Sequence, residues 1–441
     1  MSPSCFNVDR YLGVIDRLDP VRANGKVAQV VGLVVESTGP QVSVGELCFI
    51  HSSAKREPVP AEVVGFRGSR VLLMPLADVE EIANGNEVIA TGASRRVPVG
   101  MDLLGRVLDG LGRPIDGKGP IVPEAEYPIW RTPPHPLQRQ RITTPLHFGV
   151  KALDGMLTCG KGQRIGIFAG SGVGKSTLLG MIARSSSADV NVIGLVGERG
   201  REVREFIEKQ LGEEGLARSV VVVATSDQPA ILRLQGALVA MSIAEYFRDQ
   251  SMDVMLTMDS VTRCAWAQRE IGLAVGEPPT TRGYTPSVFA VLPRLLERAG
   301  AGARGTITGL FTVLVEGDDM NEPVADTVRG ILDGHVVLSR ALAAEGWYPP
   351  VEVLDSISRL MSAVAEPAHR EQAALLRRMM AVYARSEDLV RIGAYKPGSD
   401  LDLDRALRAR GAMRAFMTQD SHEQVNFADC LNRLAALAAG V

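Results

Sequence analysis

The sequence predicts a multidomain protein with an N-terminal β-barrel, a central α/β P-loop domain containing a mostly parallel sheet, and a C-terminal α-helical domain. Short β-branched runs broken by Gly and Pro fill residues 26–96, which indicates several short strands. Between residues 146 and 360, apolar strand-like runs alternate with helical stretches, as in a parallel sheet covered on both faces. Helical stretches such as EQAALLRRMMAVYARSEDLVRI follow Glu366.

These changes in sequence pattern predict the domain boundaries. We place them at residues 1–24 (N-terminal amphipathic segment), 25–97 (β-barrel), 98–365 (P-loop domain) and 366–441 (helical domain).

Composition limits the classes of protein that fit. The net charge of the 441 residues is 48 − 51 = −3, so the chain lacks the basic footprint of a protein whose main affinity is for nucleic acid. Five scattered cysteines without metal-ligand spacing indicate reduced, mostly buried thiols in a cytosolic protein: Cys5, Cys48, Cys159, Cys264 and Cys430. The N-terminus does not resemble a secretory signal, and no apolar run reaches the ~18 residues that span a bilayer.

The N-terminal segment has helical spacing of its apolar residues. Phe6, Tyr11, Leu12, Ile15 and Leu18 recur with the period of a short amphipathic helix. Two interpretations stay open: a helix packed on its own protein, or a docking handle for a partner or a membrane surface.

The barrel segment is followed by a Gly/Pro-rich stretch. The strand-like runs are VAQVVGLVVES, QVSVGELCFIH, PAEVVGFRGSRVLLMPL and GNEVIATG. The next stretch, LLGRVLDGLGRPIDGKGPI, is interpreted as a connector, and the prolines of PIWRTPPHPLQRQRITTPL favour extended or turn structure. Beyond it, the runs predicted to form buried parallel strands are RIGIFAG, VNVIGLVG, SVVVVATS, DVMLTMD and TITGLFTVLV.

The stretch IGIFAGSGVGKSTLLGMIA, residues 165–183, has the strand, Gly-rich turn and helix order of a P-loop. The glycines let backbone N–H groups wrap a phosphate, and the helix N-terminus adds positive partial charge. A lysine then reaches the β- and γ-phosphates of a nucleotide such as ATP, and a serine hydroxyl ligates Mg²⁺. The predicted phosphate-binding residues are Gly170, Ser171, Gly172, Val173, Gly174, Lys175, Ser176 and Thr177.

One position departs from the usual P-loop pattern. Ala169 occupies the place of the first glycine. Alanine is small, so this change weakens the match little if the φ angle of Ala169 is negative.

Two carboxylates are candidate functional groups beside the phosphates. Asp259 ends the run DVMLTMD, and an acid at the C-terminal end of a parallel strand lies at the ligand-binding edge; we assign it to Mg²⁺ through water, the alternative being a cap for the next helix. Glu198 follows VIGLVG and is placed to polarise an attacking water, the alternative being a solvated loop acid.

These motifs carry a family resemblance over nearly the whole chain. AGSGVGKS, GERGRE and TMDSVTR resemble the catalytic subunits of the rotary ATPase class. QREIGLAVGEPPTTRGYTPSVFAVLPRLLERAG and VLVEGDDMNEPVADTVRGILDGHVVLSRALA resemble the type III export ATPases, and LARSVVVVATSDQPA and IGAYKPGSD resemble their flagellum-specific members. The resemblance implies a RecA-like central domain and a homohexameric ring with nucleotide at the subunit interfaces.

The resemblance also implies roles for further residues. Arg263 matches an arginine near the γ-phosphate, and Arg359 matches the arginine finger given by a neighbouring subunit, with an intrachain ion pair as the alternative. Tyr348 matches the aromatic that stacks on adenine, with ordinary packing as the alternative. Phe416 matches a residue lining the far side of the base, although this chain has Asp420-Ser421 where synthase subunits carry Pro-Phe.

The function predicted is Mg-dependent ATP hydrolysis that energises or primes type III protein export for flagellar assembly. Virulence-type secretion and a proton-driven synthase subunit share the same motifs. A non-catalytic ring subunit is disfavoured because silent subunits of the resembled family carry an amide in place of the catalytic carboxylate, whereas this chain keeps Glu198. A nucleic-acid motor is disfavoured because no basic-aromatic cluster is present.

The resemblance further implies partners and a location. The expected partners are a stator-like regulatory subunit that binds the N-terminal segment, a stalk-like subunit, export substrates and their chaperones. The expected location is the cytoplasm, peripheral at the cytoplasmic face of the inner membrane beside the export gate.

Overall fold

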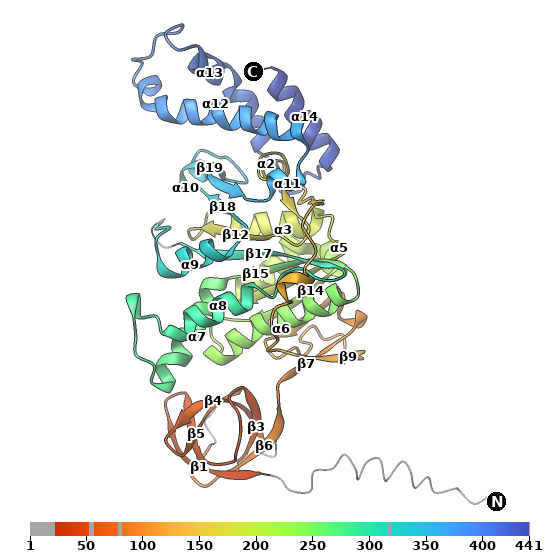
Figure 1. The fold of residues 1–441 in the computed structure, drawn as a ribbon, viewed down its shortest axis with the longest axis vertical. Helices are drawn as coiled ribbons and strands as arrows, with labels where there is room; N and C mark the ends of the chain where they lie inside the picture. Colours follow the sequence, from red (N-terminus) through yellow and green to blue (C-terminus); the bar gives the residue numbers. More distant parts are fainter. Residues whose placement is uncertain (1–22, 53–56, 78–81, 316, 318, 441) are drawn as a thin grey trace, which may run out of the picture. The chain divides into compact units, whose positions relative to one another are not determined.

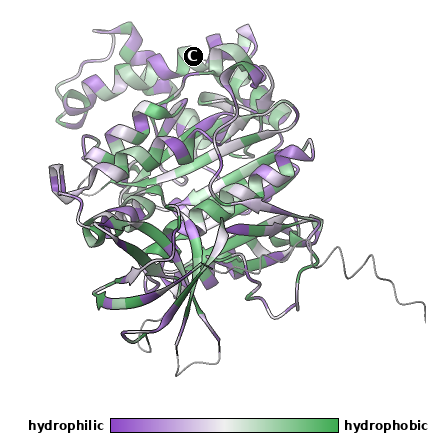
Figure 2. Cartoon of the chain, turned by 60° about the horizontal axis from the view of Figure 1, so that its bottom comes forward, coloured by the Kyte–Doolittle hydropathy of each residue, from purple (hydrophilic) through white to green (hydrophobic). Residues whose placement is uncertain are grey.

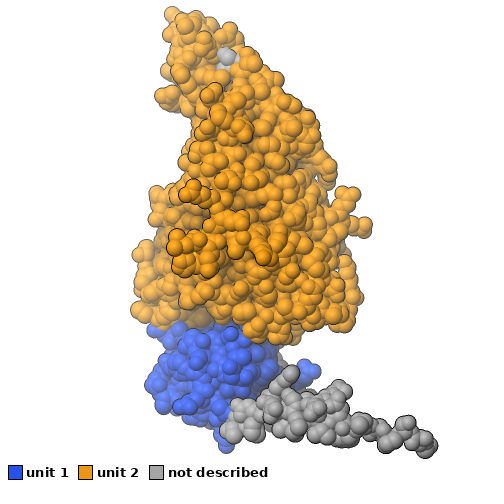
Figure 3. All heavy atoms as spheres, turned by 45° about the vertical axis from the view of Figure 1, so that its right-hand side comes forward, with its two compact units in different colours: residues 1–95, 274–276 blue, residues 96–273, 277–441 orange. Residues whose placement is uncertain are grey.

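A computed structural model describes residues 23–52, 57–77, 82–315, 317 and 319–440. Contacts divide the chain into two compact units, Met1–Arg95 with Ala274–Gly276 and Arg96–Leu273 with Glu277–Val441 (Figure 3). The predicted helix at residues 6–18 and Cys5 lie outside the described residues. The other four cysteines are free and buried, as predicted.

The first unit is a closed six-stranded antiparallel barrel, which confirms the predicted β-barrel. Its order is β1-β2-β5-β4-β3-β6. The bounds are β1 Asn24–Val31, β2 Val34–Thr38, β3 Glu46–His51, β4 Val59–Arg67, β5 Arg70–Pro75 and β6 Glu87–Ser94. Alternate residues of these strands fill the interior, among them Val35, Ile50 and Leu73, each fully buried.

The second unit is built on a nine-stranded sheet, which confirms the predicted mostly parallel α/β fold. Eight strands follow the order β19-β18-β12-β17-β15-β13-β14-β8, and β16 pairs with β17. The bounds are β8 Arg106–Asp109, β12 Arg164–Ala169, β13 Val190–Val196, β14 Ser219–Ala224, β15 Asp253–Asp259, β16 Gly300–Ala301, β17 Thr306–Leu314, β18 Gly334–Leu338 and β19 Val351–Ser358.

Helices cover both faces of this sheet (Figure 1). Helices α6 Ala230–Asp249 and α8 Pro286–Leu296 lie along one face, and α3 Lys175–Ser185 and α5 Gly212–Ala217 along the other. The strands between them are mostly hydrophobic (Figure 2), as burial on both faces favours. Within the described residues, α6 alone has the length and hydropathy to cross a membrane, yet 89% of that window is buried in the protein; it is a core helix.

The five predicted parallel strands are β12, β13, β14, β15 and β17. Sequence reasoning missed β8, because its four residues lie in the Gly/Pro-rich stretch that was interpreted as a connector. In the structure, β8 pairs in parallel with β14. Strand β19 runs antiparallel to β18 at the sheet edge, and this reversal bears on the position of Arg359.

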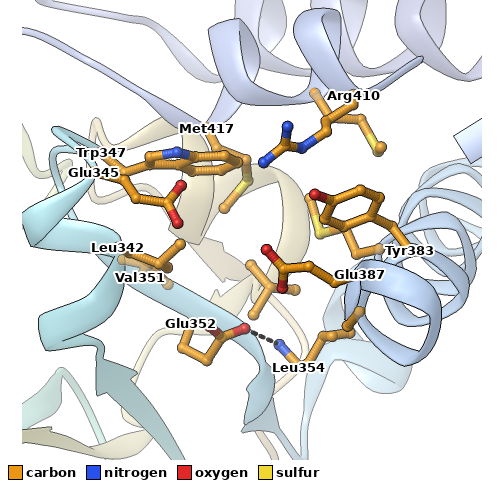
Figure 4. Close-up of a pocket in the computed structure, with 14 residues that line it drawn as sticks. Leu342, Glu345, Trp347, Val351, Glu352, Leu354, Tyr383, Glu387, Arg410 and Met417 are labelled. Carbon is orange, nitrogen blue, oxygen red and sulfur yellow. Dashed lines mark hydrogen bonds between the residues drawn. The ribbon is translucent and has the colours of Figure 1, made fainter. Parts of the chain in front are cut away.

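Three long helices form the C-terminal region, as predicted: α12 Pro367–Arg391, α13 Leu401–Met417 and α14 Phe427–Ala439. They pack against the short helix α2 Lys151–Met156 within the same compact unit. A cavity of about 160 Å³ lies where α12 and α13 meet β19 (Figure 4). Trp347 and Tyr383 line it, and the Arg410 guanidinium stacks 4.5 Å from the Tyr383 ring centre.

Candidate active site

The P-loop connects β12 to α3, as its motif predicts. Gly172 and Gly174 adopt φ angles of +77° and +98°, a left-handed region that glycine enters without steric cost. Ala169 is the last residue of β12 and pairs in parallel with Leu314, so its φ is the negative value of a strand. The departure at Ala169 therefore does not disturb the turn. Helix α3 begins at Lys175, so its N-terminus faces the site.

Lys175 lies between the two predicted carboxylates. Its ammonium Nζ contacts Asp259 Oδ1, and it lies 3.5 Å from Glu198 Oε1. The three side chains are only 11%, 4% and 13% exposed for Lys175, Asp259 and Glu198. Burial disfavours the ammonium, but the two nearby negative charges outweigh this effect and raise the pKa of Lys175 above its ordinary value. Lys175 therefore stays charged.

The sheet order explains why the two acids meet. Strands β13 and β15 are parallel neighbours with Leu195 opposite Asp259, and Glu198 follows β13 after Gly197. Burial raises the pKa of Glu198 above the ordinary glutamate value, and the charge of Lys175 opposes this only in part. A raised pKa makes the carboxylate a better proton acceptor near neutral pH.

Thr312 is a polar residue that sequence reasoning missed. It lies on β17, between the P-loop strand β12 and β15 in the sheet, and it is fully buried. Its hydroxyl donates a 2.7 Å hydrogen bond to Asp259 Oδ1. The only sequence signal was a threonine within the apolar run GLFTVLV, and the role becomes visible only when the order of the strands is known.

A cavity of about 550 Å³ opens over the P-loop. Gly170, Ser171, Gly172, Gly174, Lys175, Ser176, Thr177, Glu198 and Arg263 are predicted residues that line it, and Val173 is buried behind them. Arg199, Glu202, Trp266 and Arg340 also line it and were not predicted. The cavity is mostly polar, with room for several phosphate groups.

The oxygen groups around Lys175 suit Mg²⁺: Ser176 lines the cavity, and Asp259 is buried in contact with Lys175. One hydroxyl (Ser176) and one buried carboxylate (Asp259) are oxygen ligands of the kind this hard cation prefers. Mg²⁺ typically takes only one or two protein carboxylates and completes its shell with phosphates and water.

Arg263 approaches the cavity from helix α7, Val261–Val275. Its aliphatic stem crosses Gly197, where an added Cβ would come within 2.7 Å of Arg263 Cβ. This close approach requires glycine at that position. The guanidinium carbon lies 4.9 Å from the centre of the Trp266 ring.

The two predicted base-binding aromatics occupy different surroundings. Tyr348 is 51% exposed and its ring lies beside the P-loop, since a Cβ added to Gly174 would be 3.7 Å from Tyr348 Cε1. Phe416 is 7% exposed and belongs to the hydrophobic core, where its ring lies against Gly155 of α2. Contact of either ring with a base stays a prediction.

Arg359 lies beside the amino-terminal end of β12, whereas the P-loop of its own chain follows the carboxyl-terminal end of that strand. Its backbone N–H donates to Asp333 O (3.0 Å), and Asp333 also accepts from Arg164 at the start of β12. The P-loop follows the other end of β12, roughly 16 Å away at 3.3 Å per residue. Arg359 is exposed, and it forms no ion pair with another described residue.

The chain matches family descriptions along most of its length. These are the ATP synthase alpha/beta family beta-barrel domain at residues 27–92, the ATP synthase alpha/beta family nucleotide-binding domain at 149–358, and the T3SS EscN ATPase C-terminal domain at 365–436. The three matches coincide with the barrel, the sheet domain and the C-terminal helices.

Individual proteins are similar over nearly the full chain. It is 55% identical to the flagellum-specific ATP synthase of Bacillus subtilis (strain 168), covering 96% of this chain and 97% of that protein. It is 51% identical to the type 3 secretion system ATPase of Xanthomonas euvesicatoria, covering 94% of each.

The fold is similar to that of the assembled ATPase EscN from the type III secretion system of enteropathogenic E. coli. The TM-score is 0.89 at 43% identity, covering 94% of this chain and 100% of that chain. A second structure of assembled EscN, in complex with its central stalk EscO, gives a TM-score of 0.87 at 42% identity with the same coverage.

Proposed function

Since this chain belongs to the family of flagellum-specific ATP synthases and type 3 secretion system ATPases, we propose that it hydrolyses Mg-ATP to energise or prime type III protein export. The observation that carries the proposal is the group of Lys175, Glu198 and Asp259: Lys175 and Glu198 line the P-loop cavity, and Lys175 contacts both acids. A lysine for the phosphates, an acid for the metal and an acid for the water are the parts that phosphoryl transfer to water needs.

Each side chain has one task in this mechanism. The P-loop N–H groups and Lys175 hold the β- and γ-phosphates and offset the negative charge that builds up in transfer. Glu198 accepts a hydrogen bond from the attacking water, aligns it with the γ-phosphorus and takes its proton. The guanidinium of Arg263 offsets the negative charge of the terminal phosphate on the side where Glu198 lies. Tyr348, which is exposed beside the P-loop, stacks on the base.

Ser176 and Asp259 would hold Mg²⁺, which supplies charge neutralisation between the β- and γ-phosphates when bound. Lys175 exchanges its carboxylate partners for phosphate oxygens when ATP enters, which leaves Asp259 free to face the metal.

The position of Arg359 supports a site shared between subunits. It cannot reach its own P-loop at the other end of β12, and among the described residues its guanidinium donates one long hydrogen bond (3.4 Å), to the carbonyl of Arg329. An arginine given in trans raises phosphoryl transfer rates by ~10³–10⁵. Closed rings repeat one head-to-tail interface, so a homohexamer would place one Arg359 at every P-loop.

We propose partners and a location by analogy with the family. The solved relative EscN is assembled and binds a central stalk, EscO. We propose a corresponding stalk-like subunit here, together with a stator-like regulatory subunit, export substrates and chaperones. The protein would act in the cytoplasm, peripheral at the inner membrane beside the export gate.

Two alternatives differ from flagellar export. A virulence-type role is supported by the 51% identity to a type 3 secretion system ATPase; the identity of neighbouring genes would distinguish it. A structural ring subunit without turnover is disfavoured because the Glu198 carboxylate is present and lies 3.5 Å from Lys175.

The variant Glu198→Gln tests the proposal. It removes the proton acceptor but keeps the shape of the side chain, so we expect ATP to bind with little change while turnover falls by at least ~10³-fold. Glu214→Gln, an exposed position on α5, is the matched control and should keep the wild-type rate. Hydrolysis by Glu198→Gln at a rate near that of the wild type would show that the role assigned to Glu198 is wrong.

A further inference from the structure

The guanidinium of Arg263 has few polar contacts to hold it. Among the described residues, its buried Nε has no hydrogen-bond partner and its guanidinium has no ion-pair partner. The face of Trp266, 4.9 Å away, is the contact that restricts where the guanidinium can point. Arg263 and Trp266 are three residues apart on α7, so they share one face of the helix.

Trp266 is itself held by a chain of hydrogen bonds. Its indole Nε1–H donates to the Tyr284 hydroxyl (3.1 Å), and Tyr284 donates to Glu322 Oε1 (2.8 Å). The other oxygen of Glu322 accepts from the N–H groups of Val324 and Ala325 (3.1 and 3.0 Å) at the start of α9, Pro323–Ile331. Each link therefore has a donor and an acceptor that fit the next.

Two members of this chain of hydrogen bonds are buried, which restricts their movement. Tyr284 is 3% and Glu322 is 8% exposed, and Arg269 covers the Tyr284 ring at 5.4 Å. Burial and the hydrogen bond to Glu322 raise the pKa of Tyr284, so the hydroxyl keeps its proton. The indole also separates two cavities, since Trp266 and Leu314 line both the P-loop cavity and a second one of about 350 Å³.

We propose that Trp266, fixed by Tyr284 and Glu322, is a positioning residue that directs the guanidinium of Arg263 toward the terminal phosphate. This inference rests on the proposed function, because that function gives Arg263 its task. It adds that the plane of the Trp266 indole sets the direction of the Arg263 guanidinium. The edge of this indole is anchored at the N-terminus of α9 through its hydrogen bonds. The anchor couples the start of α9 to the phosphate end of the cavity.

Substitutions that keep the fold but loosen the indole test this. Tyr284→Phe removes only the hydroxyl, and Trp266→Leu removes the aromatic face. We expect kcat to fall about threefold for Tyr284→Phe and at least about tenfold for Trp266→Leu, with the KM for ATP nearly unchanged, because orientation rather than nucleotide binding is lost. Tyr246→Phe, which removes a buried hydroxyl bonded to Glu124 at 2.6 Å elsewhere in the unit, should keep the wild-type kcat.

A double-mutant cycle separates positioning from a general loss of stability. In an Arg263→Ala background, Tyr284→Phe should cause no further fall in kcat, because the group it positions is absent. A further threefold fall there, or wild-type kcat in both Tyr284→Phe and Trp266→Leu, would overturn the inference while leaving the proposed function intact. Wild-type kcat in Arg263→Ala alone would instead overturn the role given to Arg263, and the positioning role with it.

Discussion

At the scale of single residues, two contacts to one oxygen orient the carboxylate of Asp259, the proposed Mg²⁺ ligand. Asp259 Oδ1 receives both the Lys175 ammonium and the Thr312 hydroxyl. When Lys175 turns to a nucleotide, Thr312 is the contact that continues to hold this oxygen. The carboxylate is then oriented by a neutral hydroxyl, so its negative charge remains available to bind Mg²⁺.

Thr312→Val tests that orientation. The change conserves shape but removes the donor, so Asp259 should lose its preferred rotamer. We expect the Mg²⁺ concentration for half-maximal ATPase rate to rise about tenfold, whereas Thr312→Ser should stay near the wild type. An unchanged Mg²⁺ requirement in the valine variant would mean that the hydrogen bond is not needed for metal binding.

The pKa of Glu198 makes a prediction about pH. Burial raises this pKa above the ordinary glutamate value, and the protonated acid cannot accept a proton from water. As pH falls, kcat/KM should therefore begin to drop at a pH above that ordinary value, since this ratio reports groups of the free enzyme. A profile of kcat/KM against pH measures it, and an acid limb at or below the ordinary glutamate pKa would contradict the environment described.

At the scale of elements, α2 and α13 can pack closely because Gly155 has no side chain. A Cβ added to Gly155 would lie 2.7 Å from Phe416 Cζ, so Gly155→Ala should force the buried ring to move and cost about 1–3 kcal/mol of unfolding free energy. Gly411→Ala on α13 meets nothing within 4 Å and should stabilise that helix by up to ~1 kcal/mol.

Thermal unfolding of both variants measures this difference. The double variant Gly155→Ala with Phe416→Leu should recover part of the loss, because the smaller side chain leaves room for the added methyl. Equal melting temperatures for the two alanine variants would show that α2 and α13 do not pack as described.

The elements could be predicted where local pattern alone decides them. Continuous β-branched runs such as SVVVVATS predict buried strands, and β14 is one. Strand β8 could not be predicted, because four residues among glycines become a strand only through pairing with β14. The antiparallel direction of β19 likewise depends on its partner β18 and not on its own residues.

The candidate site divides in the same way. The P-loop residues, Glu198 and Asp259 follow strands that their own sequence predicts, so their convergence at one sheet edge could be foreseen. Thr312 and Trp266 could not be assigned, because their contacts depend on the order of β12, β17 and β15 and on loops far apart in the chain. The place of Phe416 in the core depends on the packing of α13 against α2, which no motif encodes.

At the scale of the whole molecule, the role proposed for Arg359 would make the site incomplete within one chain. Lys175 and Glu198 line the cavity of their own subunit and Asp259 contacts Lys175, whereas Arg359 lies at the opposite end of the strands from the P-loop. Assembly would therefore switch on hydrolysis, and dilution below the assembly threshold should lower the rate per subunit. The same arrangement lets each chain contribute one half of two different sites.

Mixing two inactive variants tests the central claim most directly. Glu198→Gln and Arg359→Ala proteins are each expected to form nearly inactive rings; unfolded together and refolded in equal amounts, they should recover activity, because about a quarter of the interfaces then join an intact Glu198 to an intact Arg359. ATPase activity of the mixture well above that of either variant alone is the predicted result. A mixture no more active than its parts, with ring assembly preserved, would contradict a hydrolytic site shared between neighbouring subunits.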